Sequence, residues 1–590
     1  MKLNISDHFI KYIAISLLLY SICCLFMLFL TPSSSYESSI YFSVSPFYWS
    51  MLILNFIFGI MLILISTKKY LGFFLLYLTY TLSISTHIIH GYVWWNLSGD
   101  TGTHLGIVKE ILWNGFCPKD IIYPASHVLL AEYSTILNVD IQILHLLLPV
   151  FFSLFFPLGI YLISKILLKN PIEKNIATII GFSFLPGVCI AFFPNGLINC
   201  LFPLFLFIIL KTMYNLKFAF KILTFIVFLL LTTFHPLIGM IMALIFVSMG
   251  ISIVFFDKKY HKYFNNKYDL KFFSVFLVFT ILGIIWMSWQ MQFQEFNMIL
   301  SNIVNTLNDE EYYRQAIFLN DISAANNYGY NILDYFIKTY GVYLISIIIS
   351  IIALIIFFVK KQEKNNIFWI WICLSFLYTL AVLGLFFEFG FAPTRFLFYS
   401  MVLTIPLFGY VGGLVITNDL FFRGIKFKIF FIIIGLLVLM FVILNGLFTI
   451  YPSPYTLSSS YQSTNTEVAG MNWYFNNKDT GLEITGINLP TTRFYDFIFG
   501  VGDKRLVLGG VNSLYSPFHF GYDHHISLSN SYDTSLYLGI TTRDLFKYVY
   551  VYPQMAKYRW NPRDFQRINR DSGIQKIYTN DGFELNFIGG

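Results

Sequence analysis

The chain has 590 residues, of which 57% are hydrophobic and 12% are charged, and its formal net charge is +7. A soluble globular protein carries about twice that share of charged residues, so the composition excludes this class. The basic excess does not indicate a nucleic-acid partner, because the lysines and arginines lie in short loops between apolar runs. Five of the six cysteines fall inside apolar runs and only Cys117 lies in a loop, so no disulfide framework is predicted.

Apolar runs long enough to cross a bilayer, which takes about 18 residues or more, dominate the chain. We interpret the first run as a retained helix, because it is too long for a signal-peptide core and no small-residue cleavage site follows it. The sequence therefore predicts an all-α polytopic membrane protein with about thirteen transmembrane helices. They lie near residues 9–31, 50–67, 70–95, 140–168, 175–193, 196–214, 217–235, 236–256, 271–290, 340–359, 366–387, 394–417 and 427–450.

The lysines and arginines between these spans predict the orientation of the chain. One alternate set of loops holds 19 of them, near residues 68–69, 165–174, 211–221, 258–271, 360–364 and 423–428. The opposite set holds five, namely Lys109, Lys119, Arg314, Lys338 and Arg395. Cytoplasmic loops carry the basic excess, so the first set is expected to be cytoplasmic, with the N-terminus. A multi-pass protein of the cell membrane follows, with its C-terminal part outside the cytoplasm.

The predicted domains are a transmembrane domain at 1–450, with external loops at 96–127 and 290–338, and an extracytoplasmic domain at 451–590. In the second domain charge rises and the apolar runs shorten. Thr466–Asn476 has helical spacing, and Leu482–Ile487 and Arg505–Leu508 have the composition of strands. Ile577–Ile588 predicts a hairpin around an Asn-Asp-Gly turn. We expect a small α/β domain.

A polar stretch after the third span, from Trp94 to His104, holds the first candidate site residues. Asp100 and His104 are four residues apart and share one face if this stretch is helical. Asp100 has two open interpretations: a general base that takes a proton from an acceptor hydroxyl, or the N-cap of a helix over Thr101–Trp113. His104 would position the acceptor or ligate a metal.

Tyr123 and His127 flank the start of a second external helix, with Pro124 at its first position. Both side chains are candidates to line a cleft, and the alternative for each is a structural role.

Arg395 lies at the external start of a predicted span, where Pro393 fits the first turn of a helix. A guanidinium beside a helix N-terminus is suited to bind phosphate, and His235, at another outward corner, would join it. The alternatives are an interfacial anchor or an ion pair with Glu388 for Arg395, and a hydrogen-bonded structural role for His235.

Four further residues are weaker candidates. His87 and His90, about one turn apart near the end of the third span, would bind a divalent metal together with Asp100 and His104. The loop at 290–338 is too long for a simple connector, and Glu310 or Glu311 would supply a second carboxylate to a cleft. The alternative for that segment is a solvated charged helix.

At these residues the chain resembles the GT-C superfamily of integral-membrane glycosyltransferases, and within it the polytopic archaeal and bacterial proteins with an Asp-x3-His motif followed by Tyr-Pro. The matching features are Asp100 with His104, Tyr123-Pro124, His235-Pro236, Arg395, and an external domain that opens with Glu467 and Trp473. The chain departs from the common pattern in two ways. Its acidic loop follows the third span rather than the first, and Asp100 has no paired acid.

The resemblance implies transfer of a sugar from a polyprenyl-phosphate-linked donor to an extracytoplasmic acceptor, which would be a protein, a lipid or a polysaccharide. It further implies inversion at the anomeric carbon, Asp100 as the base, Arg395 as a phosphate ligand and membrane lipid around the bundle. No cofactor is required by the residues, and a divalent metal (Mg or Mn) is left open. Two other classes also remain open: a transporter or flippase for a lipid-linked saccharide, and a non-catalytic membrane assembly protein.

Overall fold

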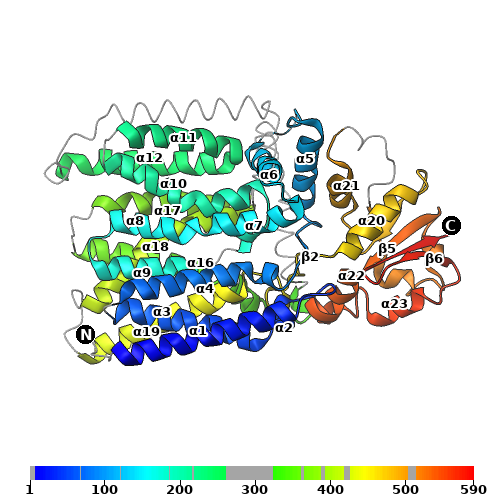
Figure 1. Cartoon of the computed structure of the whole chain (residues 1–590), viewed down its shortest axis with the longest axis horizontal. Coiled ribbons are helices and arrows are strands. Elements are labelled where there is room, and N and C mark those ends of the chain that lie inside the picture. Colours follow the sequence, from blue (N-terminus) through cyan, green and yellow to red (C-terminus); the bar gives the residue numbers. More distant parts are fainter. Residues whose placement is uncertain are drawn as a thin grey trace.

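Long apolar helices form most of the computed structural model, which describes residues 7–66, 68–119, 121, 123–184, 187–214, 218–260, 323, 325–360, 365–386, 392–417, 425–502 and 513–589. The helices lie side by side in a bundle, and the C-terminal α/β elements pack against one end of it (Figure 1). The N-terminus lies at the opposite end (Figure 1). In sequence order the bundle helices are α1 (Asp7–Leu30), α3 (Pro46–Leu64), α4 (Lys69–Ile89), α7 (Ile141–Ser153), α8 (Phe155–Leu167), α9 (Pro171–Ser183), α10 (Pro194–Tyr214), α11 (Phe218–Phe234), α12 (Pro236–Tyr260), α16 (Ile332–Lys360), α17 (Asn365–Phe386), α18 (Pro393–Thr417) and α19 (Ile425–Phe448).

Within the described residues, nine helical stretches are long and apolar enough to cross a membrane. The outer helices α1, α16 and α19 bury only 17%, 28% and 22% of their most apolar windows, so their apolar side chains face outward. Side chains of this kind need a hydrocarbon solvent, since a soluble protein rarely exposes such large apolar patches. α18 is 72% buried and packs between α9, α16 and α17, which makes it the centre of the bundle. The chain is a polytopic membrane protein.

The predicted count of thirteen spans is not confirmed. The span expected at 175–193 overlaps α9, which begins earlier, at Pro171, and has only 13 residues. Among the described residues, the apolar stretches of α11 and α12 are Phe218–Leu231 and Leu237–Ile251. The run at 140–168 is divided into α7 and α8 at Leu154, with Pro149 inside α7. The run at 271–290 lies outside the described residues.

Two short helices, α5 (Asp100–Asn114) and α6 (Ala125–Leu137), lie at the end of the bundle that faces the C-terminal domain (Figure 1). α5 ends at Gly115, whose φ of +77° is the left-handed conformation that glycine adopts without strain. The predicted start of this helix is confirmed to within one residue, but Pro124 is the N-cap of α6 and not its first residue. Just before α5, β1 (Trp94–Trp95) pairs with β2 (Gln462–Ser463), which ties the membrane bundle to the start of the C-terminal domain.

The C-terminal domain contains a mixed five-stranded sheet in the order β4-β3-β5-β7-β6. The predicted helix at 466–476, the strand at 482–487 and the hairpin at 577–588 are confirmed as α20, β3 and the β6–β7 pair, with Asp581 at a φ of +64° in the turn. The strand expected at Arg505–Leu508 lies outside the described residues. The elements are α20 (Asn465–Asn477), β3 (Ile484–Gly486), α21 (Thr491–Phe499), β4 (Ser513–Tyr515), β5 (Leu536–Thr541), α22 (Thr542–Phe546), α23 (Pro562–Ile568), β6 (Ile574–Thr579) and β7 (Phe583–Ile588).

The contact between α5 and α21 joins the two parts of the molecule. A Cβ atom at Gly106 would lie 2.2 Å from the carbonyl oxygen of Asp496, so the two backbones approach as closely as they do only because this residue is glycine. The Thr103 hydroxyl donates to the Asp496 carboxylate (2.6 Å), and Lys109 Nζ donates to the carbonyl oxygen of Phe497 (2.7 Å). An apolar core continues across this contact, from Leu105 and Val108 on α5 to Phe494 and Phe497 on α21.

We predict that Gly106→Ala lowers the thermal stability of the purified protein. The new methyl group must displace backbone, and overpacking of this kind costs about 1–3 kcal/mol. Gly435→Ala on α19 is the matched control, because nothing lies within 4 Å of its Cβ position and alanine favours the helix. The measurement is the unfolding midpoint of both variants in the same detergent. Equal midpoints would show that α5 and α21 are not held at this distance.

Candidate functional site

A cavity of about 550 Å³ lies where the bundle meets α5 and the start of the C-terminal domain. Five of the residues singled out from the sequence line it: Asp100, His104, Tyr123, His235 and Arg395. They come from α5, the segment before α6, the α11–α12 corner and the start of α18. The fold thus brings together polar groups that lie as much as 295 positions apart, from Asp100 to Arg395.

Asp100 is the first residue of α5, and its N-cap is Gly99, so Asp100 does not cap the helix. A carboxylate in the first turn is nevertheless favoured by the helix dipole. Its Oδ1 forms an ion pair with Arg493 on α21 (2.7 Å), and the Asp100 side chain remains 64% exposed. The pair fixes the position of the carboxylate at the cavity wall and leaves it accessible.

Arg493 was not identified from the sequence. Its guanidinium also donates to Thr103 Oγ1 (2.8 Å), so one arginine of the C-terminal domain holds the first turn of α5 at two points. The surrounding sequence, Pro490-Thr-Thr-Arg493, carries no charge pattern or motif that distinguishes this arginine from the others of the domain. Only the docking of α21 on α5 reveals its role.

His104 faces the cavity and is held from behind by His127. The two rings are hydrogen-bonded through His104 Nδ1 and His127 Nε2 (2.9 Å). Burial, with smaller contributions from Arg493 and His235, lowers the pKa of His104 to about 3. Burial and His104 also place the pKa of His127 well below its usual value. Both rings are therefore neutral near pH 7. His127 is buried and does not line the cavity, in contrast to the predicted cleft-lining role.

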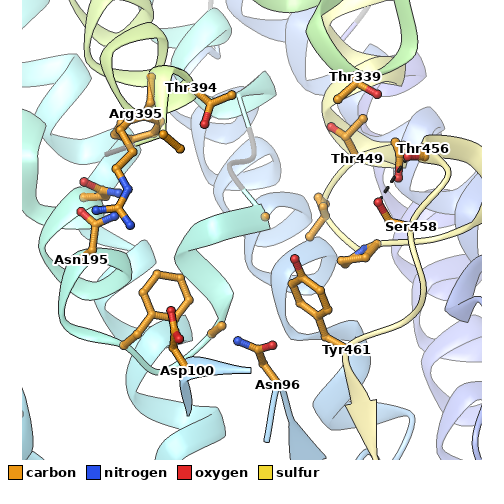
Figure 2. A pocket seen from close by; sticks show the side chains of 18 of the residues that line it. Asn96, Asp100, Asn195, Thr339, Thr394, Arg395, Thr449, Thr456, Ser458 and Tyr461 are labelled. Carbon is orange, nitrogen blue, oxygen red and sulfur yellow. Dashed lines mark hydrogen bonds between the residues drawn. The ribbon is translucent and has the colours of Figure 1, made fainter. Parts of the chain in front are cut away.

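Arg395 lies in the first turn of α18, which begins at Pro393 as predicted. In Figure 2 its guanidinium reaches from α18 toward Asn195, on the side of the cavity where Asp100 also lies. His235 is close enough for the charge of Arg395 to act on it, and burial together with that charge lowers the pKa of His235 to about 4. Tyr123 packs against His235 with ring centroids 5.4 Å apart. This wall combines one permanent cation with neutral polar groups.

The opposite wall consists of residues that the sequence analysis did not select. Figure 2 shows Asn96 and Tyr461 beside Asp100, and Thr339, Thr449, Thr456 and Ser458 farther along the cavity. Asn96 adopts a φ of +62°, and its backbone N–H donates to the carbonyl oxygen of Tyr461 (2.7 Å), which extends the β1–β2 pairing. Apolar side chains complete the lining, including Phe184, Ala191, Val342, Phe398 and Ile450. The cavity is therefore polar at one end and apolar along its walls.

The other candidates do not join this site. His87 is buried and contacts the Tyr451 hydroxyl (Nδ1 to Oη 3.3 Å), and His90 Nε2 is paired with Glu37 (3.1 Å). Within the described residues, no group of three or more His, Cys, Asp and Glu side chains is arranged to hold a metal ion. The metal site predicted from His87 and His90 is thus not supported. Glu310 and Glu311 lie outside the described residues.

Glu467 and Trp473, the other features of the resemblance, have structural roles in α20. Glu467 completes a capping box with Thr464, whose backbone N–H donates to its carboxylate (2.9 Å). Trp473 stacks on Tyr578 with ring centroids 4.8 Å apart.

The fold and the site define a class: a polytopic membrane protein with a buried, cation-bearing cavity at the junction between its helical bundle and a C-terminal α/β domain. No protein-family model and no curated protein matches the chain. Among solved structures it is similar to the apo oligosaccharyltransferase of Archaeoglobus fulgidus, with a TM-score of 0.47 and 11% identity over 88% of this chain and 74% of that one. It is also similar to that enzyme in complex with Zn and sulfate, with a TM-score of 0.45 and 11% identity over 82% of this chain and 71% of that one.

A third similar structure is the archaeal oligosaccharyltransferase AglB from Archaeoglobus fulgidus in complex with an inhibitory peptide and a dolichol-phosphate. Its TM-score is 0.43, with 10% identity over 92% of this chain and 75% of that one. These neighbours are oligosaccharyltransferases.

We predict that the protein loses stability as the pH falls from about 6.5 to 4, because the unfolded chain then binds protons that the native His104 and His235 do not. The loss reaches about 1.4 kcal/mol per pH unit for each histidine. The measurement is the unfolding midpoint at pH 7.5 and pH 5. On acidification, the unfolding midpoint of His104→Gln should fall by less than that of the wild type. The exposed His524→Gln is the control and should behave as the wild type does. Identical pH dependence in both variants would contradict the assignment.

Proposed function

We propose that the protein is a membrane glycosyltransferase that moves a sugar from a polyprenyl-phosphate-linked donor to an acceptor outside the cytoplasm. The observation that supports this most strongly is the shared cavity. An accessible carboxylate, Asp100, and a guanidinium at a helix start, Arg395, line the same space, which also has apolar walls. A lipid-linked sugar phosphate offers matching chemistry: an anion, a sugar and a hydrocarbon chain.

The donor phosphate is proposed to bind at Arg395. The guanidinium offers charge-assisted hydrogen bonds, and the first turn of α18 adds the positive end of the helix dipole. His235 is neutral at pH 7 and can donate one hydrogen bond without adding charge. As the bond between the anomeric carbon and the phosphate oxygen breaks, negative charge grows on the phosphate, and a fixed cation there stabilises the transition state.

Asp100 is proposed to act as the general base. The acceptor oxygen or nitrogen forms a bond to the anomeric carbon while its proton passes to the Asp100 carboxylate, and the polyprenyl phosphate departs with the electron pair of the broken bond. The leaving group is already an anion, so no general acid is needed. A single displacement of this kind inverts the anomeric centre. His104, held by His127, positions the acceptor from the same wall.

A metal is assigned no step. Asp100 is the one acidic side chain among the described residues that line the cavity, and its Oδ1 already pairs with Arg493.

We propose that residues 451–590 form the external domain, with the N-terminus in the cytoplasm, on the basis of the basic excess of one set of loops. The lipid chain of the donor would lie along the apolar wall formed by Phe184, Val342 and Phe398.

The first test is Asp100→Asn, assayed as release of polyprenyl phosphate from a panel of synthetic polyprenyl-phosphate monosaccharides incubated with cell-envelope acceptor. General-base catalysis contributes about 10²–10⁴-fold, so the rate should fall by at least 100-fold. Asp140→Asn is the matched control, because Asp140 caps α7 through Gln142 N–H, and asparagine caps equally well. Unchanged release by the Asp100→Asn variant would eliminate Asp100 as the base. Vesicle uptake without release would identify a transporter instead.

The second test is Arg395→Ala, measured as equilibrium binding of a radiolabelled polyprenyl-phosphate sugar to the purified protein. Loss of a charge-assisted contact to phosphate should weaken binding by about 10-fold or more. Arg395→Lys should retain part of the affinity, since it keeps the charge but not the planar donor pair. Lys338→Ala removes another cation, one that pairs with Asp334 and does not line the cavity, and should leave binding unchanged. Equal affinity in wild type and Arg395→Ala would make Arg395 an interfacial anchor.

A further inference from the structure

A second cavity, of about 500 Å³, adjoins Asp100 where the start of α5 meets the C-terminal domain. Four residues line both cavities: Asn96, Asp100, Ser458 and Tyr461. The Asp100 carboxylate therefore stands at the boundary between the two spaces. A molecule in the second cavity would face the same carboxylate as a sugar phosphate in the first.

The lining of the second cavity is rich in hydroxyl and amide groups. Ser458, Ser459 and Ser460 follow one another along one wall, and Asn96 and Asn488 supply amides. The rings of Tyr461 and Tyr552 add flat amphipathic surfaces. Dense hydroxyl and amide donors together with aromatic faces match the alternating polar and apolar surfaces of a sugar ring. No aliphatic side chain is among the described residues that line this cavity.

Two cations, Arg543 and Lys547, also line this cavity. Arg543 is 8% exposed and is largely engaged, since its guanidinium donates to Ser98 Oγ and to the carbonyl oxygen of Gln462. The charges of Glu467 and Asp544 act on it as well. Its Nε is buried and has no hydrogen-bond partner within the described residues. Most of the Arg543 charge is thus balanced by protein groups, and the Nε–H group remains as an unused hydrogen-bond donor among the described residues.

The charge of Lys547 is compensated by fewer protein groups than the charge of Arg543. Within the part of the chain that the structure describes, the Lys547 ammonium group has no hydrogen bond and no ion pair, and it lies 5.8 Å from the centroid of the Tyr548 ring. The charge of Asp544 acts on it; Oδ2 of that carboxylate accepts hydrogen bonds from Thr541, and Oδ1 is buried without a hydrogen-bond partner within the described residues. The Lys547 side chain is partly buried, and burial lowers its pKa. Partial burial of an unpaired ammonium group costs free energy of folding, and an anionic ligand that pairs with it offsets this cost.

We propose that the second cavity binds a saccharide that carries an anionic group, with Lys547 contacting the anion and the serine and asparagine side chains contacting the hydroxyl groups. The role of this saccharide as the acceptor rests on the proposed transferase function, whereas its binding does not. In that role one of its hydroxyl groups faces Asp100, gives up its proton to the carboxylate and forms the new glycosidic bond. The anion would be a carboxylate or a phosphate, both of which the ammonium group accepts equally.

The test measures equilibrium binding of four probes to the full-length protein in detergent: a galacturonic acid trimer, phosphorylated maltotriose, uncharged maltotriose and an acidic tripeptide. One or both charged trisaccharides should bind at least 10-fold more tightly than maltotriose, and the stronger one identifies the anion. Lys547→Gln should abolish that difference, and Lys547→Arg should retain it. Lys557→Gln removes an exposed lysine that lines neither cavity and should leave all affinities unchanged.

Three results would overturn the proposal: no preference for charged trisaccharides, a preference that persists in Lys547→Gln, or Lys547-dependent binding of the tripeptide alone. The unfolding midpoint of Lys547→Gln, measured alongside, excludes loss of folding as the cause. The Asp100→Asn variant separates this proposal from the transferase function, because it should lose transfer but keep the Lys547-dependent preference for charged over uncharged trisaccharide, whatever its overall affinity. Binding without any transfer in the wild type would reject the transferase and leave the saccharide site standing.

Discussion

The docking of α5 on α21 is the contact on which the rest of the site depends. α5 carries Asp100 at its first position, and among the described residues no side chain of the membrane bundle pairs with that carboxylate. Arg493 does so from the C-terminal domain, through one bond to Asp100 and one to Thr103. The approach is possible because Gly106 presents no side chain to the Asp496 backbone. The C-terminal domain is therefore part of the site and not an appendage.

The electrostatics of the first cavity follow from where its groups are placed. Arg395 cannot lose its charge at any physiological pH, whereas burial makes His104 and His235 neutral. Had these histidines been protonated, they would have repelled Arg395 and competed with it for an anion. The result is one positive end near α18 and one negative group at α5, in a cavity whose remaining walls are uncharged. Such a separation suits a reaction in which negative charge leaves at one end and a proton leaves at the other.

Local patterns in the sequence predicted the elements well and their meeting points less well. Pro393, Pro124 and the Asn580–Gly582 turn act within a few residues, so the starts of α18 and α6 and the β6–β7 hairpin were predictable. The choice of Asp100, His104 and Arg395 rested on polar groups at predicted span ends, and the fold places all three on one cavity. Arg493 and Tyr461 were not predictable, since their importance depends on docking between distant segments. The metal pairing of His87 and His90 is not supported, and their observed partners were not predictable for the same reason: Tyr451 and Glu37 are distant in sequence.

The two cavities and their shared wall bear on which class of function fits the molecule. A transporter needs one continuous route with charged or broken helices near the middle of the membrane. Here the polar groups gather at the end of the bundle, where α5, α18 and the C-terminal domain meet, and α18 runs through the bundle centre as a single helix over Pro393–Thr417. Two spaces that share Asn96, Asp100, Ser458 and Tyr461 among the described residues can hold two different molecules with one carboxylate between them. That arrangement serves a reaction between the molecules better than the passage of either, because the group at the boundary is one that can take up a proton.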